Sequence, residues 1–261
     1  MDTAHCAAAS DLLHELWISG RRIGELPAAL RPLTRADGYA IQALIERFSA
    51  APLFGWKIAA TSAAGQAHIH VDAPLAGRIL GQRVIPNGGR CRLEHNRMRV
   101  AELEFAFRMR ADLPPRLTPY ETAEILGQVA SLHPAIEIPD SRFEPFESAG
   151  MAQLIADNAC AHDFLLGAAA DERWRRIDLA AHEVWGFLDD DRPLRGVGAN
   201  VLGDPRTALS WLVNELSSNG MTLRAGEVVT TGTCLMPIRI REGRRLRGDF
   251  GALGAVSVTF A

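Results

Sequence analysis

Two segments near the start of the chain place apolar residues at helical spacing. The first runs from Ser10, a candidate N-cap, to Gly20 and presents four apolar side chains on one face, Leu12, Leu13, Leu16 and Trp17. The second follows Thr34, with Asp37 in the position of a capping box, and its apolar stripe consists of Ile41, Leu44, Ile45 and Phe48. Both stripes are typical of helices that pack against a core, so the pattern predicts a helical N-terminal part.

From residue 53 onward, several segments change to the period of two that is typical of strands. Residues 100–107 alternate strictly, which places Glu102 and Glu104 on one face of the predicted strand and apolar side chains on the other. Shorter strand signals occupy residues 53–58, 135–138, 228–230, 238–240 and 256–260. These segments indicate that the later part of the chain is rich in β structure.

Two more helices are expected between the strands. Thr118 and Glu121 form a capping box, which predicts a helix that continues through Val129. Asp204 is a candidate N-cap for another helix that ends before Gly220. The mixture predicts an α+β fold, with an N-terminal helical segment in residues 1–85 and a β-rich body in residues 86–261.

The composition is that of a globular protein and excludes several classes of partner. Of the 261 residues, 48% are hydrophobic and 23% are charged, which allows a sizeable core. The 28 basic and 31 acidic residues give a net charge of -3, too balanced for a binder of nucleic acid or anionic membranes. Because no apolar run could span a bilayer and the four cysteines form no CxxC pair, we expect a cytoplasmic protein without disulfides.

Three carboxylates are candidates for metal binding. Glu102 and Glu104 project from one strand face, separated by about two residue rises of 3.3 Å, a spacing that suits one hard cation. A solvent-exposed acidic strand face is the alternative, which the spacing alone favours. Glu137 adds a third carboxylate between two isoleucines, where an unpaired charge is unfavourable. Three oxygen ligands without a nearby cysteine or histidine would select Mg2+ or Mn2+ rather than zinc.

Lys57 and a pair of histidines are further candidates. Lys57 is isolated among apolar neighbours, so it either extends to the surface or is kept inside for charge or proton transfer. His68 and His70 have the same-face spacing of a strand and form a rival metal site, but no third ligand of the usual type follows them. The residues alone leave these alternatives open.

Two short polar segments have the composition of ligand-binding loops. They are residues 157–160 (Asp-Asn-Ala-Cys) and residues 231–234 (Thr-Gly-Thr-Cys). Cys160 and Cys234 are interpreted as small packing residues rather than nucleophiles, because only His162 offers a basic neighbour. The acidic run at residues 189–191 lacks the spaced ligands of a calcium loop and is expected to be a solvated turn.

Short segments in a fixed order along nearly the whole chain carry a family resemblance. They are residues 40–42 (Ala-Ile-Gln), 55–58 (Gly-Trp-Lys-Ile), 71–74 (Val-Asp-Ala-Pro), 101–106 (Ala-Glu-Leu-Glu-Phe-Ala), 134–138 (Pro-Ala-Ile-Glu-Ile), 156–159 (Ala-Asp-Asn-Ala) and 231–232 (Thr-Gly). In this order they resemble the 2-hydroxypenta-2,4-dienoate hydratase and 4-oxalocrotonate decarboxylase family, a branch of the fumarylacetoacetate hydrolase superfamily. No single segment is decisive, but their collinear order is specific.

The resemblance implies a fold and a set of site residues. The fold is a β-rich body of the fumarylacetoacetate hydrolase C-terminal type with an N-terminal helical part, assembled into homo-oligomers. Lys57 matches the lysine beside the metal in this family. The carboxylates that match the ligands of the family's Mg2+ or Mn2+ are Glu102, Glu104 and Glu137. Substrate contacts are expected from Cys160, Thr231 and Gly232.

The implied activity is that of a metal-dependent lyase in aromatic-compound catabolism. Such a hydratase adds water to a small 2-hydroxy-dienoate or 2-oxo-enoate through a metal-stabilised enolate and gives a 4-hydroxy-2-oxo acid. Lys57 would move a proton or stabilise charge if burial and the cation lower its pKa. The same enolate forms in decarboxylation of a 4-oxalocrotonate-type acid and in acylpyruvate-type C–C hydrolysis. A non-catalytic subunit associated with a paralogous decarboxylase or hydratase is the remaining alternative.

Three positions depart from the family pattern. Leu75 occupies the place of an aspartate, and a leucine cannot exchange a proton. Cys160 replaces a serine, and His162 replaces a glycine two positions later. We therefore expect altered substrate contacts, with Asp72 as a catalytic residue, or His70 in its place, if proton exchange is needed.

Overall fold

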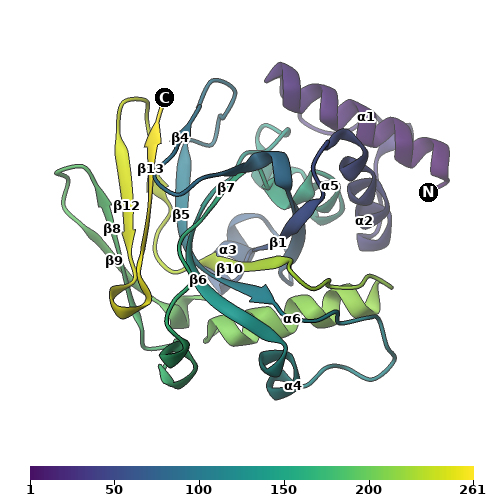
Figure 1. Cartoon of the computed structure of the whole chain (residues 1–261). Coiled ribbons are helices and arrows are strands. Elements are labelled where there is room, and N and C mark those ends of the chain that lie inside the picture. Colours follow the sequence, from purple (N-terminus) through teal and green to yellow (C-terminus); the bar gives the residue numbers. More distant parts are fainter.

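Two β-sheets form the centre of the computed structural model, which describes residues 1–261 (Figure 1). The larger sheet has eight strands in the order β2-β1-β10-β5-β6-β7-β3, with β11 paired to β5. Its strands are β1 (Leu53–Ala59), β2 (Leu75–Leu80), β3 (Val84–Ile85), β5 (Val100–Met109), β6 (Val129–Ile138), β7 (Asp163–Leu166), β10 (Val228–Thr233) and β11 (Ile238–Arg239). The five-stranded sheet has the order β4-β13-β12-β8-β9. Its strands are β4 (Arg90–Cys91), β8 (Glu183–Leu188), β9 (Leu194–Val197), β12 (Arg245–Asp249) and β13 (Ala255–Phe260).

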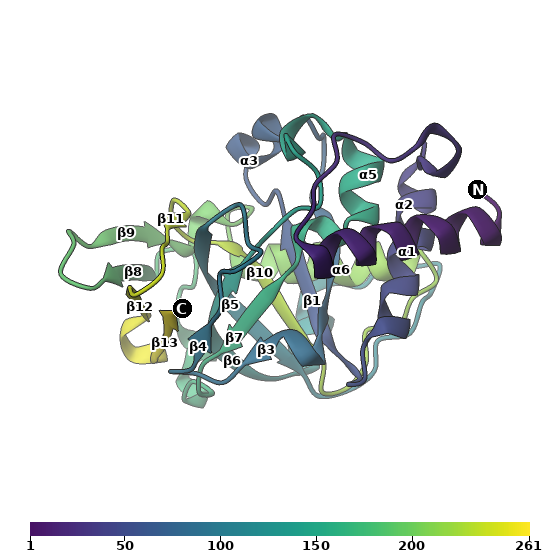
Figure 2. The same ribbon diagram turned by 90° about the horizontal axis from the view of Figure 1, so that it is seen from above.

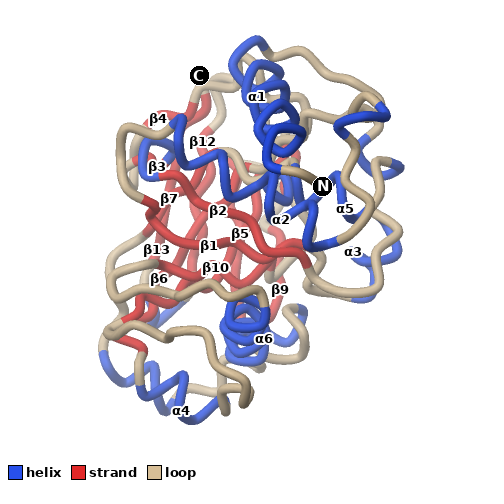
Figure 3. Tube along the Cα trace, turned by 90° about the vertical axis from the view of Figure 1, so that its right-hand side faces the viewer, coloured by secondary structure: helices blue, strands red, loops and turns tan.

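Helices cover the larger sheet from two sides. Figure 3 shows α1 and α2 on one side of the strands and α6 on the other, while Figure 2 shows α1, α2 and α5 grouped at one end. The α-helices are α1 (Thr3–Ser19), α2 (Arg35–Ala43), α3 (Ala63–His68), α4 (Thr122–Gly127), α5 (Met151–Ala156) and α6 (Pro205–Ser218). The 3-10 helices are η1 (Ala28–Leu30), η2 (Leu44–Phe48), η3 (Gly81–Arg83), η4 (Phe146–Ser148), η5 (Asn158–Cys160), η6 (Glu172–Arg176), η7 (Gly198–Asn200) and η8 (Gly251–Leu253). None of the helices combines the length and the apolar character needed to cross a bilayer.

The α+β class and the N-terminal helical part are confirmed, and local chemistry explains several elements. Thr34 accepts a hydrogen bond from the N–H of Asp37 in a capping box, so α2 begins where predicted. Asp204 caps α6 in the same manner. The acidic run at residues 189–191 is a turn, as predicted, where Arg244 pairs with Asp189 and Asp191.

Two predicted helices have different bounds in the structure. The first begins at Thr3 with Asp2 as its cap, and Ser10 is a buried residue in its interior. The helix expected from Thr118 through Val129 begins only at Thr122 and ends at Gly127, so that prediction is wrong at both ends. The early end has a tertiary reason, because residues 129–137 pair with β5 and this pairing overrides the local helical signal.

The two parts predicted on either side of residue 85 share one sheet. Residues 53–85 supply β1, β2 and β3, and β1 pairs in parallel with β10 from the other end of the chain. This pairing requires Gly55, because a Cβ there would lie 1.9 Å from the carbonyl oxygen of Val228. One hydrophobic core includes Leu13 of α1, Leu103 of β5 and Val258 of β13. The fold therefore brings the N-terminal part and the later strands around a common centre, and the division at residue 85 stays a prediction.

Candidate metal and catalytic site

The three predicted carboxylates converge on neighbouring strands. β5 and β6 are antiparallel, and their register places Glu102 opposite Glu137, while Glu104 lies two residues further along the same face of β5. One carboxylate oxygen of each residue lies within 4.8 Å of the others. Glu104 and Glu137 are buried and Glu102 is half-buried, so the alternative of an exposed acidic strand face is wrong.

Several oxygens of this cluster lack hydrogen-bond donors. Oε1 of Glu104 and both carboxylate oxygens of Glu137 are buried without an aligned donor. The other oxygen of Glu104 accepts hydrogen bonds from the Thr230 hydroxyl and, at 2.8 Å, from the N–H of Gly232. Buried carboxylate oxygens without donors are unfavourable unless a cation neutralises them. An all-oxygen donor set of this kind fits a hard divalent cation.

Burial and mutual repulsion raise the pKa values of all three carboxyl groups. Burial, followed by the charge of Glu137, raises the pKa of Glu102 to about 7. The pKa of Glu104 lies well above its ordinary range, because burial and both neighbouring carboxylates disfavour its charge. Burial also raises the pKa of Glu137, although the Lys57 ammonium acts in the opposite direction. The three groups therefore titrate as a unit and bind protons readily in the absence of a metal.

Lys57 reaches the carboxylates from β1. Its Nζ lies 2.9 Å from Oε1 of Glu137 in an ion pair and donates a hydrogen bond to the carbonyl of Ala159 at 2.9 Å. The side chain is only 3% exposed, so the surface alternative for Lys57 is wrong. Burial alone would lower the pKa of this amine, but the charges of Glu137 and Glu102 outweigh burial and raise the pKa above its ordinary value.

The predicted ligand loop at residues 157–160 is a tight turn beside Lys57. Asn158, Ala159 and Cys160 all have left-handed backbone angles, with φ values of 57°, 50° and 61°. Cys160 is half-buried at the end of this turn. Burial raises the pKa of the Cys160 thiol to about 12, so the thiol stays protonated and is not an activated nucleophile.

Thr231 and Gly232 belong to β10, so the loop expected at residues 231–234 is wrong for these positions. The pairing of β10 with β5 shifts register between Thr230 and Thr233, so the strand is irregular where a loop was expected. Gly232 has a φ of 102° and directs its N–H to Glu104. The Thr231 hydroxyl instead donates to the carbonyl of Phe105 at 3.0 Å.

The remaining candidates lie outside the carboxylate cluster. His68 ends α3 and His70 follows it with a left-handed φ of 54°, so the predicted strand spacing of the histidines is wrong. Both histidines are exposed, and the cluster of metal-binding type contains neither of them. Asp72 is exposed in the segment between α3 and β2. Its catalytic role stays a prediction.

The structure also locates the departures from the family pattern. Leu75 is the first residue of β2, fully buried and paired with Ala59 of β1. His162 precedes β7, with Nδ1 3.0 Å from Oδ2 of Asp163 and its ring 5.5 Å from that of Trp17. Because Leu75 has no ionisable group, any proton exchange in its place requires another residue or water.

Some residues at the cluster were not identified from sequence patterns. Thr230 supports Glu104 by a hydrogen bond that only the pairing of β10 with β5 brings about, and no local motif marks this contact. For Lys57, which was identified, the sequence holds one further signal: it is the only lysine among the 28 basic residues of the chain. An arginine does not release its proton near neutral pH, so a single buried lysine in an arginine-rich chain is informative.

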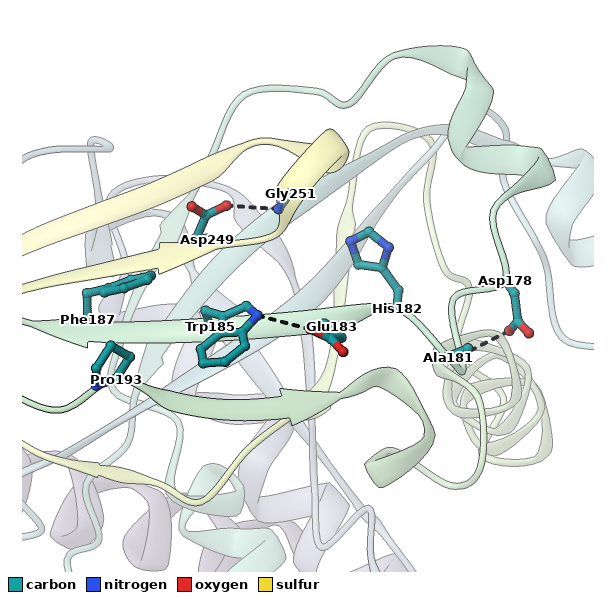
Figure 4. Close-up of a pocket in the computed structure, with 9 residues that line it drawn as sticks. All are labelled: Asp178, Ala181, His182, Glu183, Trp185, Phe187, Pro193, Asp249 and Gly251. Atoms are coloured by element: carbon teal, nitrogen blue, oxygen red, sulfur yellow. Dashed lines mark hydrogen bonds between the residues drawn. The ribbon is translucent and has the colours of Figure 1, made fainter.

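A separate hollow of about 760 Å³ lies on the five-stranded sheet (Figure 4). Its lining includes Trp185 and Phe187 of β8 together with Glu183 and Asp249. Two of its three acids are already paired, Glu183 with Arg195 and Asp249 with Arg247, and the third, Asp178, accepts a hydrogen bond from the Ala181 N–H. The hollow therefore lacks the clustered, unpartnered carboxylates that make the site between β5 and β6 the candidate active site.

The chain is similar to several known enzymes and to solved structures. No protein-family model matches the chain. A 2-keto-4-pentenoate hydratase of Dechloromonas aromatica is 31% identical over 257 residues, which cover 97% of each chain. A 4-oxalocrotonate decarboxylase of a Pseudomonas species is 28% identical over 205 residues, covering 78% of this chain and 77% of the relative. The 4-oxalocrotonate decarboxylase of Pseudomonas putida G7, solved with magnesium and adipate, superposes with a TM-score of 0.90 at 24% identity over 100% of this chain and 99% of that one.

Proposed function

Because the chain belongs to the family of 2-keto-4-pentenoate hydratases and 4-oxalocrotonate decarboxylases, with the fold of the fumarylacetoacetate hydrolase superfamily, we propose that it is a divalent-metal-dependent lyase. The proposed reaction adds water to a small 2-hydroxy-dienoate or 2-oxo-enoate and gives a 4-hydroxy-2-oxo acid. The observation that carries this proposal is the buried triad of carboxylates with unpartnered oxygens beside a single buried lysine.

We propose that Glu102, Glu104 and Glu137 hold Mg2+ or Mn2+. Support comes from two buried oxygens without a donor, Oε1 of Glu104 and Oε2 of Glu137, and from an all-oxygen donor set, which both ions favour. The related decarboxylase was solved with magnesium and also with calcium, two hard cations of this kind. When bound, the cation would supply Lewis-acid stabilisation of the enolate through which tautomerisation and hydration proceed.

Lys57 is the proposed catalytic residue for proton transfer. In the metal-free protein its ammonium holds a proton at Nζ, because Glu137 and Glu102 stabilise its charge. Neutralisation of these carboxylates by a cation removes that stabilisation and lowers the pKa of Lys57 toward a value suited to proton exchange. Asp72 is proposed as a second group for proton exchange in place of Leu75, since it is the exposed carboxylate that precedes β2. Cys160, Thr231 and Gly232 are the proposed substrate contacts.

Decarboxylation of a 4-oxalocrotonate-type acid is the second candidate. It is favoured by the related decarboxylases and by Leu75, because loss of carbon dioxide does not require a group that places water. Acylpyruvate-type C–C hydrolysis uses the same enolate, and a non-catalytic partner subunit would retain the fold without turnover. The buried triad and Lys57 favour an enzyme over such a subunit.

Product analysis distinguishes these reactions. The purified chain is incubated with 2-hydroxypenta-2,4-dienoate, 4-oxalocrotonate and an acylpyruvate, with Mg2+, with Mn2+ and with EDTA, and ultraviolet absorbance and products are followed. We expect metal-dependent conversion of the dienoate to a 4-hydroxy-2-oxo acid. Carbon dioxide release from 4-oxalocrotonate alone would replace the hydratase proposal with the decarboxylase. Absence of turnover with all three compounds would support the partner-subunit alternative.

We propose that the chain forms homo-oligomers through the outer face of the five-stranded sheet. Trp185 is 36% exposed on this face. The ion pairs Glu183–Arg195 and Asp249–Arg247 lie beside it, so in a symmetric dimer the acid of one copy could pair with the arginine of the other. Analytical ultracentrifugation should show an oligomer that Trp185→Glu weakens, and mixing with a paralogous decarboxylase or hydratase tests association between them.

A cytoplasmic location is also proposed, since the four cysteines are unpaired.

A further inference from the structure

The left-handed turn of η5 requires support from its surroundings. Three consecutive residues other than glycine, Asn158, Ala159 and Cys160, hold positive φ values. Asparagine adopts this backbone more readily than other residues with a side chain, but alanine and cysteine rarely do, so three in succession persist only where other contacts hold them. The Cys160 carbonyl accepts a hydrogen bond from the Asp140 N–H at 2.9 Å, which fixes the end of the turn.

The side chain of Asn158 fixes the start of the turn to β2. Its Oδ1 accepts a hydrogen bond from the N–H of Arg78 at 2.6 Å, and its Nδ2 donates to the carbonyl of Arg78 at 2.8 Å. β2 is the edge strand of the larger sheet, so the amide pairs with this strand as a neighbouring backbone would. Asn158 is fully buried, and Gln42 of α2 holds the same strand by donating to the carbonyl of Ala76 at 2.8 Å.

The turn of η5 also contacts Lys57, the proposed catalytic lysine. The Ala159 carbonyl accepts a hydrogen bond from Lys57 Nζ at 2.9 Å, opposite the ion pair with Glu137. Gly77 of β2 leaves room for both partners, because a Cβ there would lie 2.4 Å from the Asn158 carbonyl oxygen and 3.1 Å from Cγ and Cδ of Lys57. The lysine stem and the turn thus pack against the same glycine.

We infer that Asn158 is a positioning residue, which holds the left-handed turn so that the Ala159 carbonyl fixes Lys57 Nζ against Glu137. Without the two bonds to Arg78, the turn would relax toward negative φ, and the Ala159 carbonyl would move away from the amine. This positioning of Lys57 is expected in the metal-free chain. Its meaning for catalysis rests on the proposed function of Lys57.

The chain offers a direct test, because Lys57 is its only lysine. An amine-reactive reagent can modify only Lys57 and the N-terminal amine of Met1, which serves as an internal reference in mass spectrometry. The matched control is Asn214 of α6, whose Oδ1 accepts from the Tyr120 N–H at 2.7 Å and whose Nδ2 donates to the Tyr120 carbonyl at 3.1 Å. Asn214→Ala removes the same pair of bonds from a helix that makes no hydrogen bond to Lys57 or to η5.

In metal-free protein, Asn158→Ala should raise the labelling of Lys57 relative to Met1 several-fold. Asn214→Ala should leave this ratio unchanged even if it lowers the melting temperature. Equal increases in both variants, or no increase in Asn158→Ala, would overturn the inference. If Asn158→Ala does not fold, Asn158→Asp replaces it, because this variant keeps the acceptor for the Arg78 N–H and loses only the donor.

The kinetic consequence is separate from the labelling result. With an active substrate, Asn158→Ala should reduce kcat by about 100-fold, as expected for a small displacement of a catalytic group, while the dissociation constant of Mg2+ stays unchanged. A fall in kcat of equal size in Asn214→Ala would contradict a positioning role. If the wild-type chain converts none of the substrates, the proposed function fails, whereas the labelling ratio still decides the role of Asn158.

Discussion

Glu104 is a fully buried member of the carboxylate cluster, where a negative charge is unfavourable without a cation. We expect Glu104→Gln to abolish metal-dependent turnover, because the amide removes one anionic ligand while it retains an acceptor for the Gly232 N–H. The same change should raise the melting temperature of the metal-free protein near neutral pH, because the amide does not need the proton that burial and the charges of Glu137 and Glu102 force on the carboxyl group in the folded state. Calorimetry with Mg2+ and thermal unfolding measure both effects. Full activity of EDTA-treated Glu104→Gln protein would disprove the metal assignment.

Substitution of Lys57 by arginine distinguishes the role of its positive charge from its proposed role in proton transfer. Lys57→Arg keeps a cation beside Glu137 but cannot release a proton near neutral pH. We expect kcat to fall by roughly 100-fold to 10,000-fold, as for the loss of a general acid or base, with metal binding largely retained. Steady-state kinetics and Mg2+ titration test this prediction. An unchanged kcat would remove Lys57 from proton transfer and leave it as a structural partner of Glu137.

Among the helices and strands, sequence patterns correctly predicted the starts of two helices that are set by local capping residues. α2 and α6 begin at their predicted caps, because a side chain within the segment satisfies the first N–H groups. Val129 was predicted as the end of a helix and is the first residue of β6, because its pairing with β5 is not visible in local sequence. The strands β8, β9 and β12 were not identified, and two of them are interrupted by glycines that pack against the larger sheet, Gly186 and Gly248.

The contact between β2 and the turn η5 should tolerate no added side chain. Gly77→Ala would place a Cβ 2.4 Å from the Asn158 carbonyl oxygen, so either the strand or the turn must shift. We expect a lower melting temperature together with a loss of kcat. Gly127→Ala, where an added Cβ meets nothing within 4 Å, is the matched control and should be neutral or slightly stabilising. Similar melting temperatures and rates for both variants would contradict the proposed tight contact.

The whole molecule explains why the site was only partly predictable. The spacing of Glu102 and Glu104 is a local property, so the sequence placed them on one strand face, but it could not show whether that face was buried. Glu137 and Lys57 reach them through the pairing of β6 with β5 and of β1 with β10. The N-terminal part therefore contributes both the lysine and, through Gln42, a brace for the strand that positions it. We propose that this coupling makes the two parts one catalytic unit.

The stability of the metal-free molecule should fall as the pH rises from about 4.5 to about 7. The pKa of Glu102 is about 7 in the folded state and 4.5 ordinarily, so in this window the folded protein keeps a proton that the unfolded chain releases. The lowered pKa values of His14 and His133, caused mainly by burial, act in the opposite direction near pH 6.5. Lys57 stays protonated in both states and adds no slope. The contribution of Glu102 to this slope is therefore the difference between wild type and Glu102→Gln, in which Glu104 and Glu137 remain.

We expect the melting temperature of the metal-free wild type, relative to Glu102→Gln, to fall on the order of 5 °C between pH 5 and pH 8. Saturating Mg2+ should reverse this loss at pH 8 and have little effect at pH 5, because bound protons compete with the cation for the same oxygens. Differential scanning calorimetry of both proteins with EDTA and with Mg2+ provides the measurement. Parallel pH profiles for the two proteins, or equal stabilisation by Mg2+ at both pH values, would show that the buried carboxylates neither hold protons nor bind the metal as proposed.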